Sequence, residues 1–149
     1  MTRQFPLQSL LDLSQLRLDE ATRRLGELIS GEQEASQRLE LLTQYRAEYQ
    51  ERFVAAAQSG LSPKEWQNYR SFLQKLDDAV NQAASMVAQS KQRTAMGQQE
   101  WLNKRGKVKA FDTLSQRHQS RLDQADNRQE QKASDEHSAR RYFVDDHDN

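Results

Sequence analysis

The sequence contains no cysteine, only two prolines and only five glycines in 149 residues. Without cysteine it offers no disulfide, thiolate metal site or thiol nucleophile, which fits a reducing compartment. Apolar residues make up 35% of the chain, against about 45 to 50% in typical globular domains, so we expect no large compact core. The longest apolar run, residues 53–57, is far shorter than the roughly 20 residues of a membrane-spanning helix. The first 13 residues lack the apolar stretch of a signal peptide, so we expect a cytoplasmic protein.

Motifs of catalysis and cofactor binding are also missing. The sequence has no glycine-rich phosphate loop and neither an HExxH nor a GxSxG pattern. Its 22 basic and 22 acidic residues cancel, so no net charge draws the chain toward nucleic acid or an anionic membrane. We therefore expect no enzyme, no cofactor, no metal, no nucleic-acid partner and no direct membrane insertion. His118 is expected to be an ordinary structural histidine.

The few helix breakers are placed so that they divide the chain into two long helices. Pro6 and Pro63 are the only prolines, and the stretch after each is free of proline. Just before Pro63, Gly60 can take the left-handed conformation that follows a helix end, and Ser62 can cap the next helix. Glu65 would complete the capping box. The expected elements are a helix over residues 7–59, a turn at 60–62, a helix over 63–140 and a disordered tail at 141–149.

Both stretches repeat apolar residues in heptads, labelled a to g. The a positions include Leu11, Leu18, Leu25, Leu39 and Phe53 in the first stretch, and Trp66, Leu73, Val80, Val87, Trp101 and Val108 in the second. A repeat of 3.5 residues kept over this length is typical of a coiled coil. A register centred on Leu61 places each a position opposite a d position. The sequence therefore predicts one intramolecular hairpin rather than two independent helices.

That register also pairs large residues with small ones, as a packed seam requires. The predicted large and small partners are Trp66 with Ala56, Trp101 with Ala21, and Leu25 with Gly97. The pair of Phe53 with Tyr69 breaks this pattern. Because the second stretch is longer than the first, its end has no partner helix. The predicted fold is thus all-α, a long two-helix antiparallel coiled-coil hairpin over residues 1–149 with an overhanging second helix.

One edge of this hairpin differs from the other. In an antiparallel pair the g positions of both helices share an edge, and near the turn they carry Tyr45, Phe72, Ala79 and Met86. The e positions on the opposite edge are mostly polar. Aromatic residues from two helices at nearly the same level indicate a docking surface. They can equally broaden the core, and the sequence leaves both interpretations open.

A second candidate surface is the run from Trp101 to Phe111. It holds Lys104, Arg105, Lys107 and Lys109 and no acidic residue. Such a run is either a solvated helix face or a surface for an anionic partner. Base stacking is not expected, because Trp101 and Phe111 lie on the predicted seam.

Four segments of the chain resemble the flagellar export protein family FliJ. They are residues 41–49 (LLTQYRAEY), 57–62 (AQSGLS) and 66–73 (WQNYRSFL), with residues 21–27 (ATRRLGE) in further agreement. The similarity covers about residues 7–135. The order and spacing of the YxxEY, SG-turn and NYxxF elements carry it.

The resemblance implies a non-enzymatic part of the flagellar type III export apparatus. Such a protein is a central-stalk-like coiled coil that promotes assembly and activity of the hexameric export ATPase FliI. It links this ATPase to the export gate protein FlhA, escorts export chaperones, and associates peripherally with the apparatus at the inner membrane. It is expected to be a monomer when free.

The resemblance also implies binding residues. Those implied for the gate are Leu42, Tyr45, Tyr49, Phe72, Leu76 and Ala79, three of which belong to the g edge near the turn. Lys104, Arg105, Lys107 and Lys109 would then be the expected ATPase contact. The alternative is a generic tethering coiled coil that acts as a spacer or a homodimer.

Overall fold

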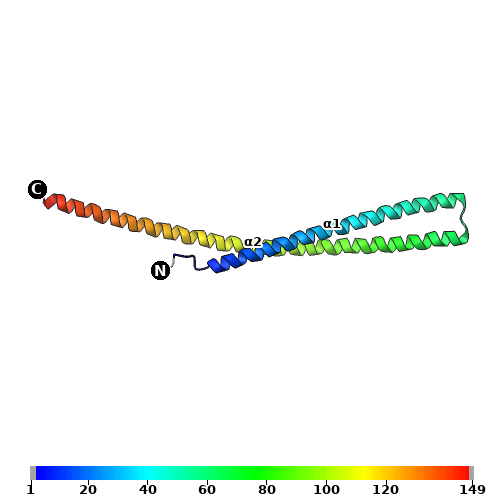
Figure 1. Ribbon diagram of the computed structural model, residues 1–149, viewed down its shortest axis with the longest axis horizontal. Coiled ribbons are helices and arrows are strands. Elements are labelled where there is room, and N and C mark those ends of the chain that lie inside the picture. The colour runs from blue at the N-terminus through cyan, green and yellow to red at the C-terminus, as the bar shows by residue number, and fades with distance from the viewer. Residues whose placement is uncertain (1–2, 148–149) are drawn as a thin grey trace. The chain divides into compact units, whose positions relative to one another are not determined.

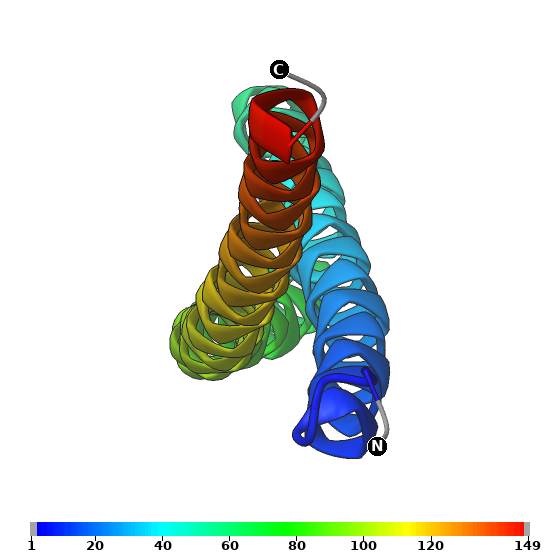
Figure 2. The same ribbon diagram turned by 90° about the vertical axis from the view of Figure 1, so that its left-hand side faces the viewer.

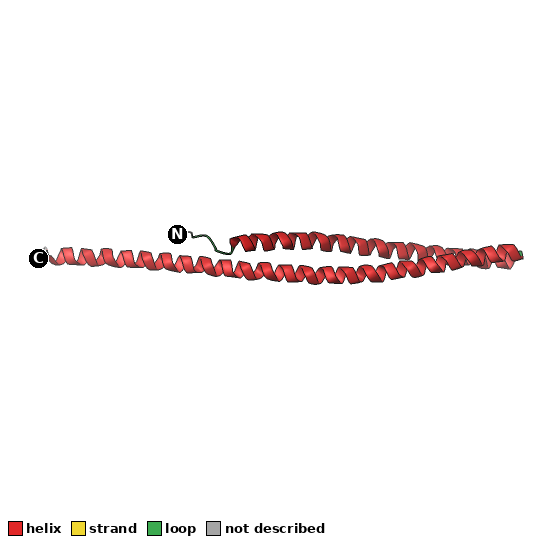
Figure 3. Cartoon of the chain, turned by 90° about the horizontal axis from the view of Figure 1, so that it is seen from below, coloured by secondary structure: helices red, strands yellow, loops and turns green. Residues whose placement is uncertain are grey.

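The computed structural model describes residues 3–147, with side chains as far as Val144. It contains α1 (Gln8–Ser59) and α2 (Pro63–His147), and the described residues form helix and loop but no strand (Figures 1 and 3). The predicted all-α fold is confirmed, and both helices begin within one residue of the expected position. None of the helical segments described is both long and apolar enough to cross a bilayer.

The chain divides into two compact units, which are described separately. The turn unit is Asp19–Asn103 and contains the end of α1, the start of α2 and the turn between them. The terminal unit combines Met1–Leu18 with Lys104–Asn149. The sequence had indicated a single unit over the whole length.

The turn between the helices has the local chemistry expected from its sequence. Gly60 adopts a φ of 95°, a conformation that residues with a side chain rarely take. Its amide donates to the carbonyl of Ala57 at 3.2 Å and thereby ends α1. Ser62 Oγ accepts a hydrogen bond from the amide of Glu65 at 3.2 Å, which caps the start of α2.

A narrow seam between α1 and α2 forms the core of the turn unit. Its most buried members are Ala21, Leu73, Leu76 and Ala83. Gly97 is also buried, and the remaining a and d residues of this unit are partly buried, with the exception of the exposed Trp66. The heptad assignment is thus confirmed, and the small core agrees with the low apolar content.

Contacts across the seam confirm the predicted register. Thr94 Oγ1 donates to the carbonyl oxygen of Leu28 at 3.3 Å, and these residues are equally distant from Leu61 in the sequence. A methyl group on Gly97 would lie 3.7 Å from Leu25 Cδ1 and 2.6 Å from Leu28 Cδ1. Gly97 therefore faces the leucine it was paired with, and its lack of a side chain gives Leu28 room.

Polar contacts across the turn unit add specificity to the register. Arg24 Nη1 lies 2.7 Å from Glu100 Oε1, and Arg46 is paired with Asp77. The hydrogen bond from Arg46 to Asp77 and the charge of that carboxylate raise the pKa of the guanidinium. Because these side chains are well exposed to solvent, such ion pairs contribute little stability.

In the terminal unit, the residues before α1 fold against α2. The rings of Phe5 and His118 have centroids 5.7 Å apart, and His118 Nε2 lies 3.3 Å from the carbonyl oxygen of Arg3. Arg3 also forms an ion pair with Asp126. His118 is half-buried by these contacts, in agreement with the structural role expected for it.

The last part of α2 has no partner in the terminal unit. Every described side chain from residue 127 to 144 is exposed, and the helix continues through this stretch, drawn orange to red in Figure 2. It ends at His147 instead of 140, so residues 141–147 are helical where the sequence had indicated disorder. The last two residues lie outside the described chain. Helix persists because the stretch lacks glycine and proline and forms i,i+4 contacts such as Gln131 to Asp135 at 3.1 Å.

Candidate protein-binding surface

Aromatic side chains form a continuous cluster in the turn unit. Tyr45 meets Phe72 edge to face, with ring centroids 6.3 Å apart and an interplanar angle of 83°. Tyr49 packs against Phe72 at 4.5 Å and against Tyr69 at 5.4 Å. Contacts of this kind stabilise a pair beyond the area they bury. Of the two rings expected on the g edge, Phe72 therefore packs against Tyr49, and Tyr45 packs against Phe72.

The cluster continues toward the turn through Phe53 and Trp66. Phe53 lies 5.4 Å from Tyr69 and 5.0 Å from Trp66 between ring centroids. Trp66 is 45% exposed, so the prediction that it would be buried opposite Ala56 is wrong. Trp66 lies in the first turn of α2, where the seam ends, and its ring packs on Phe53 instead.

The pKa of the central tyrosine of the cluster is shifted upward. Partial burial raises the pKa of the Tyr49 phenol, and neighbouring Tyr69 and Tyr45 raise it further, whereas Arg52 opposes the shift. A tyrosine phenol is protonated at neutral pH at its ordinary pKa, and the upward shift keeps it so. Tyr49 can then act as a neutral hydrogen-bond donor at this surface.

An open groove of about 530 Å³ lies in the turn unit. We call it the turn-unit groove. It is lined by Gly31, Glu34, Ala35, Arg38, Leu42, Ala79, Gln82, Ala83, Met86, Ser90 and Arg93. Many of these side chains are small, which leaves the seam hollow beside the g edge, and two arginines and one glutamate supply its charge.

The structure distributes the six residues implied for gate binding over three kinds of environment. Tyr45 is 45% exposed, and Leu76 is buried in the seam at 6%. The others, Leu42, Tyr49, Phe72 and Ala79, are half-buried. Leu42 and Ala79 line the turn-unit groove, and Tyr45, Tyr49 and Phe72 belong to the aromatic cluster. Five of the six are thus partly accessible to a partner, and Leu76 supports them from the core.

Sequence reasoning overlooked several residues of this groove. Gly31 and Ala35 in α1 and Arg93 in α2 line it but were not singled out. The sequence did contain a signal for this groove, namely small residues at neighbouring g and d positions of both helices. Such residues leave the seam partly unfilled. The exposed Met86, at 50%, was identified through its g position and does line the groove.

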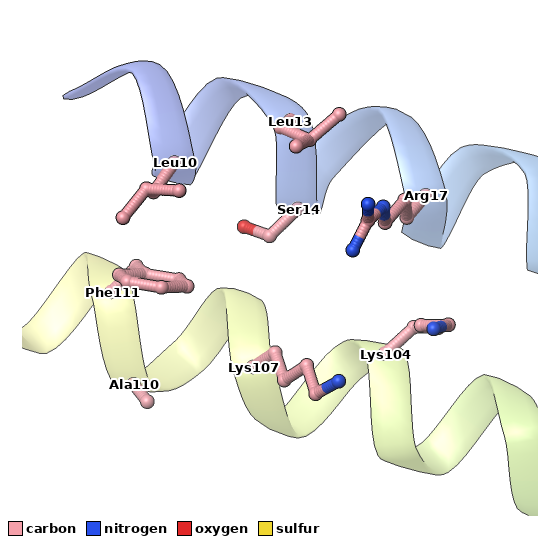
Figure 4. Close-up of a pocket in the computed structure, with 8 residues that line it drawn as sticks. All are labelled: Leu10, Leu13, Ser14, Arg17, Lys104, Lys107, Ala110 and Phe111. Atoms are coloured by element: carbon pink, nitrogen blue, oxygen red, sulfur yellow. The ribbon is translucent and has the colours of Figure 1, made fainter. Parts of the chain in front are cut away.

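The four basic residues of the run 104–109 do not all line one groove. Lys104 and Lys107 line an open groove of about 380 Å³, whereas Arg105 and Lys109 do not. We call it the terminal-unit groove. Its lining is Leu10, Leu13, Ser14, Arg17, Lys104, Lys107, Ala110 and Phe111 (Figure 4). Lys104 is half-buried at a d position, and Arg105, Lys107 and Lys109 are exposed.

In the described part of the chain, no three or more His, Asp or Glu side chains are gathered in a way that could hold a metal ion. The candidate surfaces combine aromatic and aliphatic groups with charged and polar ones, which suits them to binding a protein.

Comparison with known proteins identifies the family. The family described as "Flagellar FliJ protein" matches residues 3–146. The chain is 31% identical over 140 residues to the flagellar FliJ protein of Salmonella typhi, covering 94% of this chain and 95% of that protein. It is also 31% identical over 134 residues to the flagellar FliJ protein of Escherichia coli (strain K12), covering 90% and 91%. The chain therefore belongs to the FliJ family and is a component related to flagellar protein export.

Proposed function

We propose that this chain is a non-enzymatic stalk of the flagellar export apparatus that joins the export ATPase to the export gate. One observation carries the proposal. The turn unit presents a rigid aromatic and apolar surface on one edge of a two-helix hairpin, made by Tyr45, Phe72 and the groove beside them. Ordered aromatic residues next to a groove are typical of binding sites in which a few residues carry most of the affinity.

The gate protein FlhA is the partner proposed for this surface. Tyr45 and Phe72 would make the central contacts, and Leu42 and Ala79 would line the groove that receives an apolar side chain. Tyr49 and Leu76 would position these residues from behind. Family membership supports this assignment, because residues 41–49 and 66–73, which resemble the family, include most of these positions.

The terminal unit is proposed to contact the ATPase FliI. A two-helix rod placed in the centre of a ring is asymmetric, so it contacts the subunits of the ring unequally. Such contacts favour the assembled ring by binding it preferentially and can bias the order of hydrolysis without any chemistry in the rod. The basic residues of this unit supply the charge for that contact. Chaperone escort and peripheral association with the inner membrane belong to the same proposal.

The experiment that tests the ATPase contact uses the cognate ATPase. Adding the wild-type chain is expected to increase hexamer formation and phosphate release. Replacing Lys104, Arg105, Lys107 and Lys109 together with alanine should remove about half or more of the stimulation at low salt, because charged contacts mainly accelerate and orient association.

The control changes the same number of charges elsewhere. Its four alanine substitutions are at Lys64, Arg70, Lys75 and Lys91, all in the turn unit. The control variant should keep nearly full stimulation. If the wild-type chain failed to stimulate the ATPase, the proposed stalk role would be contradicted. If both variants lost stimulation equally, the effect of the four basic residues would be one of net charge and not of a specific contact.

A further inference from the structure

The terminal-unit groove has an apolar end and a basic end. In Figure 4, Leu10 of α1 and Phe111 of α2 face each other at one end, and Arg17 and Lys104 face each other at the other, with Lys107 between them. Leu10 and Arg17 are one heptad apart, so the two ends are separated by two helical turns, or about 10 Å.

The apolar part of this groove is accessible to solvent. Leu10 is 46% exposed and Leu13 is 42% exposed, although both lie on the helix that carries the seam. At this level the seam position of α1 is occupied by Ser14, which is 8% exposed. Its hydroxyl group donates a hydrogen bond to the carbonyl oxygen of Leu11 at 2.8 Å. The exposed parts of Leu10 and Leu13 can therefore contact a partner.

The charge of the groove has one sign. Its lining includes Arg17, Lys104 and Lys107 and no acidic residue. Arg3 and Asp126 form an ion pair in the terminal unit, and no ion pair found among the described residues involves Arg17, Lys104 or Lys107. Three basic side chains beside an apolar floor therefore select an occupant that carries both apolar and acidic groups.

An amphipathic helix meets both requirements at the observed spacing. It can place an apolar residue between Leu10 and Phe111 and acidic residues two turns further on, opposite Arg17 and Lys104. Helices of this kind bind grooves through residues spaced three, four and seven apart. We infer that the terminal-unit groove binds an acidic amphipathic helix of the export ATPase. This inference rests on the proposed function.

The inference predicts different effects for two exposed lysines of α2. Lys107 lines the groove, whereas Lys91 lies in the turn unit and does not line it. Lys107→Glu is expected to weaken binding of the purified cognate ATPase at least about tenfold, because it places a like charge against the acidic helix. Lys91→Glu changes the net charge equally, at a position outside the proposed ATPase contact, and should alter the affinity by less than about twofold.

A second pair of variants tests the apolar floor. Leu13 lines the groove, whereas Leu16, at 60% exposure, does not. Leu13→Ala should weaken ATPase binding about fivefold or more through loss of apolar burial, and Leu16→Ala should leave the affinity unchanged. Both substitutions replace an exposed leucine by a strong helix former, so circular dichroism should show equal helicity for the two variants.

A cross-linking experiment then identifies the occupant. A benzoylphenylalanine placed at position 13 should cross-link to an ATPase peptide that is both amphipathic and acidic, and one placed at the exposed position of Leu41 should not. A cross-link from position 13 to a second copy of the chain, or to a basic or non-helical ATPase segment, would overturn the inference.

The outcomes keep the inference and the proposed function apart. If the wild-type chain binds the ATPase and the two lysine variants lose affinity equally, the groove is not the site and the inference fails while the proposed function stands. If the wild-type chain does not bind the ATPase at all, the proposed function fails and the inference falls with it.

Discussion

Replacing Gly97 with leucine is expected to destabilise the turn unit by about 1 to 3 kcal/mol, the usual cost of overpacking a well-filled core. Even a methyl group at this position would lie 2.6 Å from Leu28 Cδ1. Alanine could be tolerated by a small shift of that terminal methyl group, but leucine would push its branched end into both Leu25 and Leu28. Thermal unfolding followed by circular dichroism measures the loss as a lower Tm.

Gly106 provides the matched control for this substitution. No atom outside its own helix lies within 4 Å of the place a side chain would occupy, and its backbone is helical. Gly106→Leu should therefore raise stability by up to about 1 kcal/mol through helix propensity alone. If Gly97→Leu were also stabilising, the close contact between α1 and α2 at this level would be absent in solution.

Removing the two aromatic rings of the g edge is expected to abolish most binding to the export gate. Tyr45→Ala and Phe72→Ala together should weaken the affinity for detergent-purified FlhA about 30-fold or more, because the loss of even one central aromatic of an interface often costs about 2 kcal/mol, which is about 30-fold. Tyr45 is 45% exposed and Phe72 is half-buried, so the hairpin should remain helical. Isothermal titration calorimetry measures the affinity and circular dichroism measures the helicity.

The control removes two other exposed apolar side chains of the turn unit. Leu41 is 66% exposed and Val54 is 47% exposed, and neither belongs to the aromatic contacts or the turn-unit groove. Leu41→Ala with Val54→Ala should bind the gate as the wild-type chain does. A large loss of helicity in the Tyr45 and Phe72 variant would show that these rings serve the core, which is the alternative left open by the sequence.

The sequence predicted the hairpin because two independent signals agree on Leu61. Local chemistry predicts a turn from Gly60, Ser62 and Pro63, and the heptad pattern predicts a register whose centre lies at the same place. The structure confirms both, through the positive φ of Gly60 and the hydrogen bond from Thr94 to Leu28. A coiled coil is favourable for such prediction because each seam position has a defined partner.

Features that depend on side-chain packing were beyond the same reasoning. Periodicity assigned Trp66 to the seam, but the end of the seam leaves it 45% exposed on Phe53. The basic run was one feature in the sequence, whereas helical geometry separates Lys104 and Lys107 from Lys109. The end of α2 was placed too early because a polar helix can persist through local contacts when no seam remains.

Both candidate surfaces depend on the chain folding back on itself within one molecule. Because the sequence contains no cysteine, cysteines introduced at Arg23 and Gln99 would be the only sites for spin labels. Both positions are exposed, lie within the turn unit and are equally distant from Leu61. Labelled protein diluted into an excess of unlabelled protein reports only distances within a chain.

Double electron–electron resonance on this diluted sample tests the hairpin most directly. The account predicts a narrow distribution of label-to-label distances at about 20 to 35 Å, which is the width of two packed helices plus their labels. This distribution should not change on dilution. A distance that disappears on dilution would indicate a homodimeric coiled coil. A single extended helix would instead separate the labels by on the order of 100 Å, and either result would contradict the account.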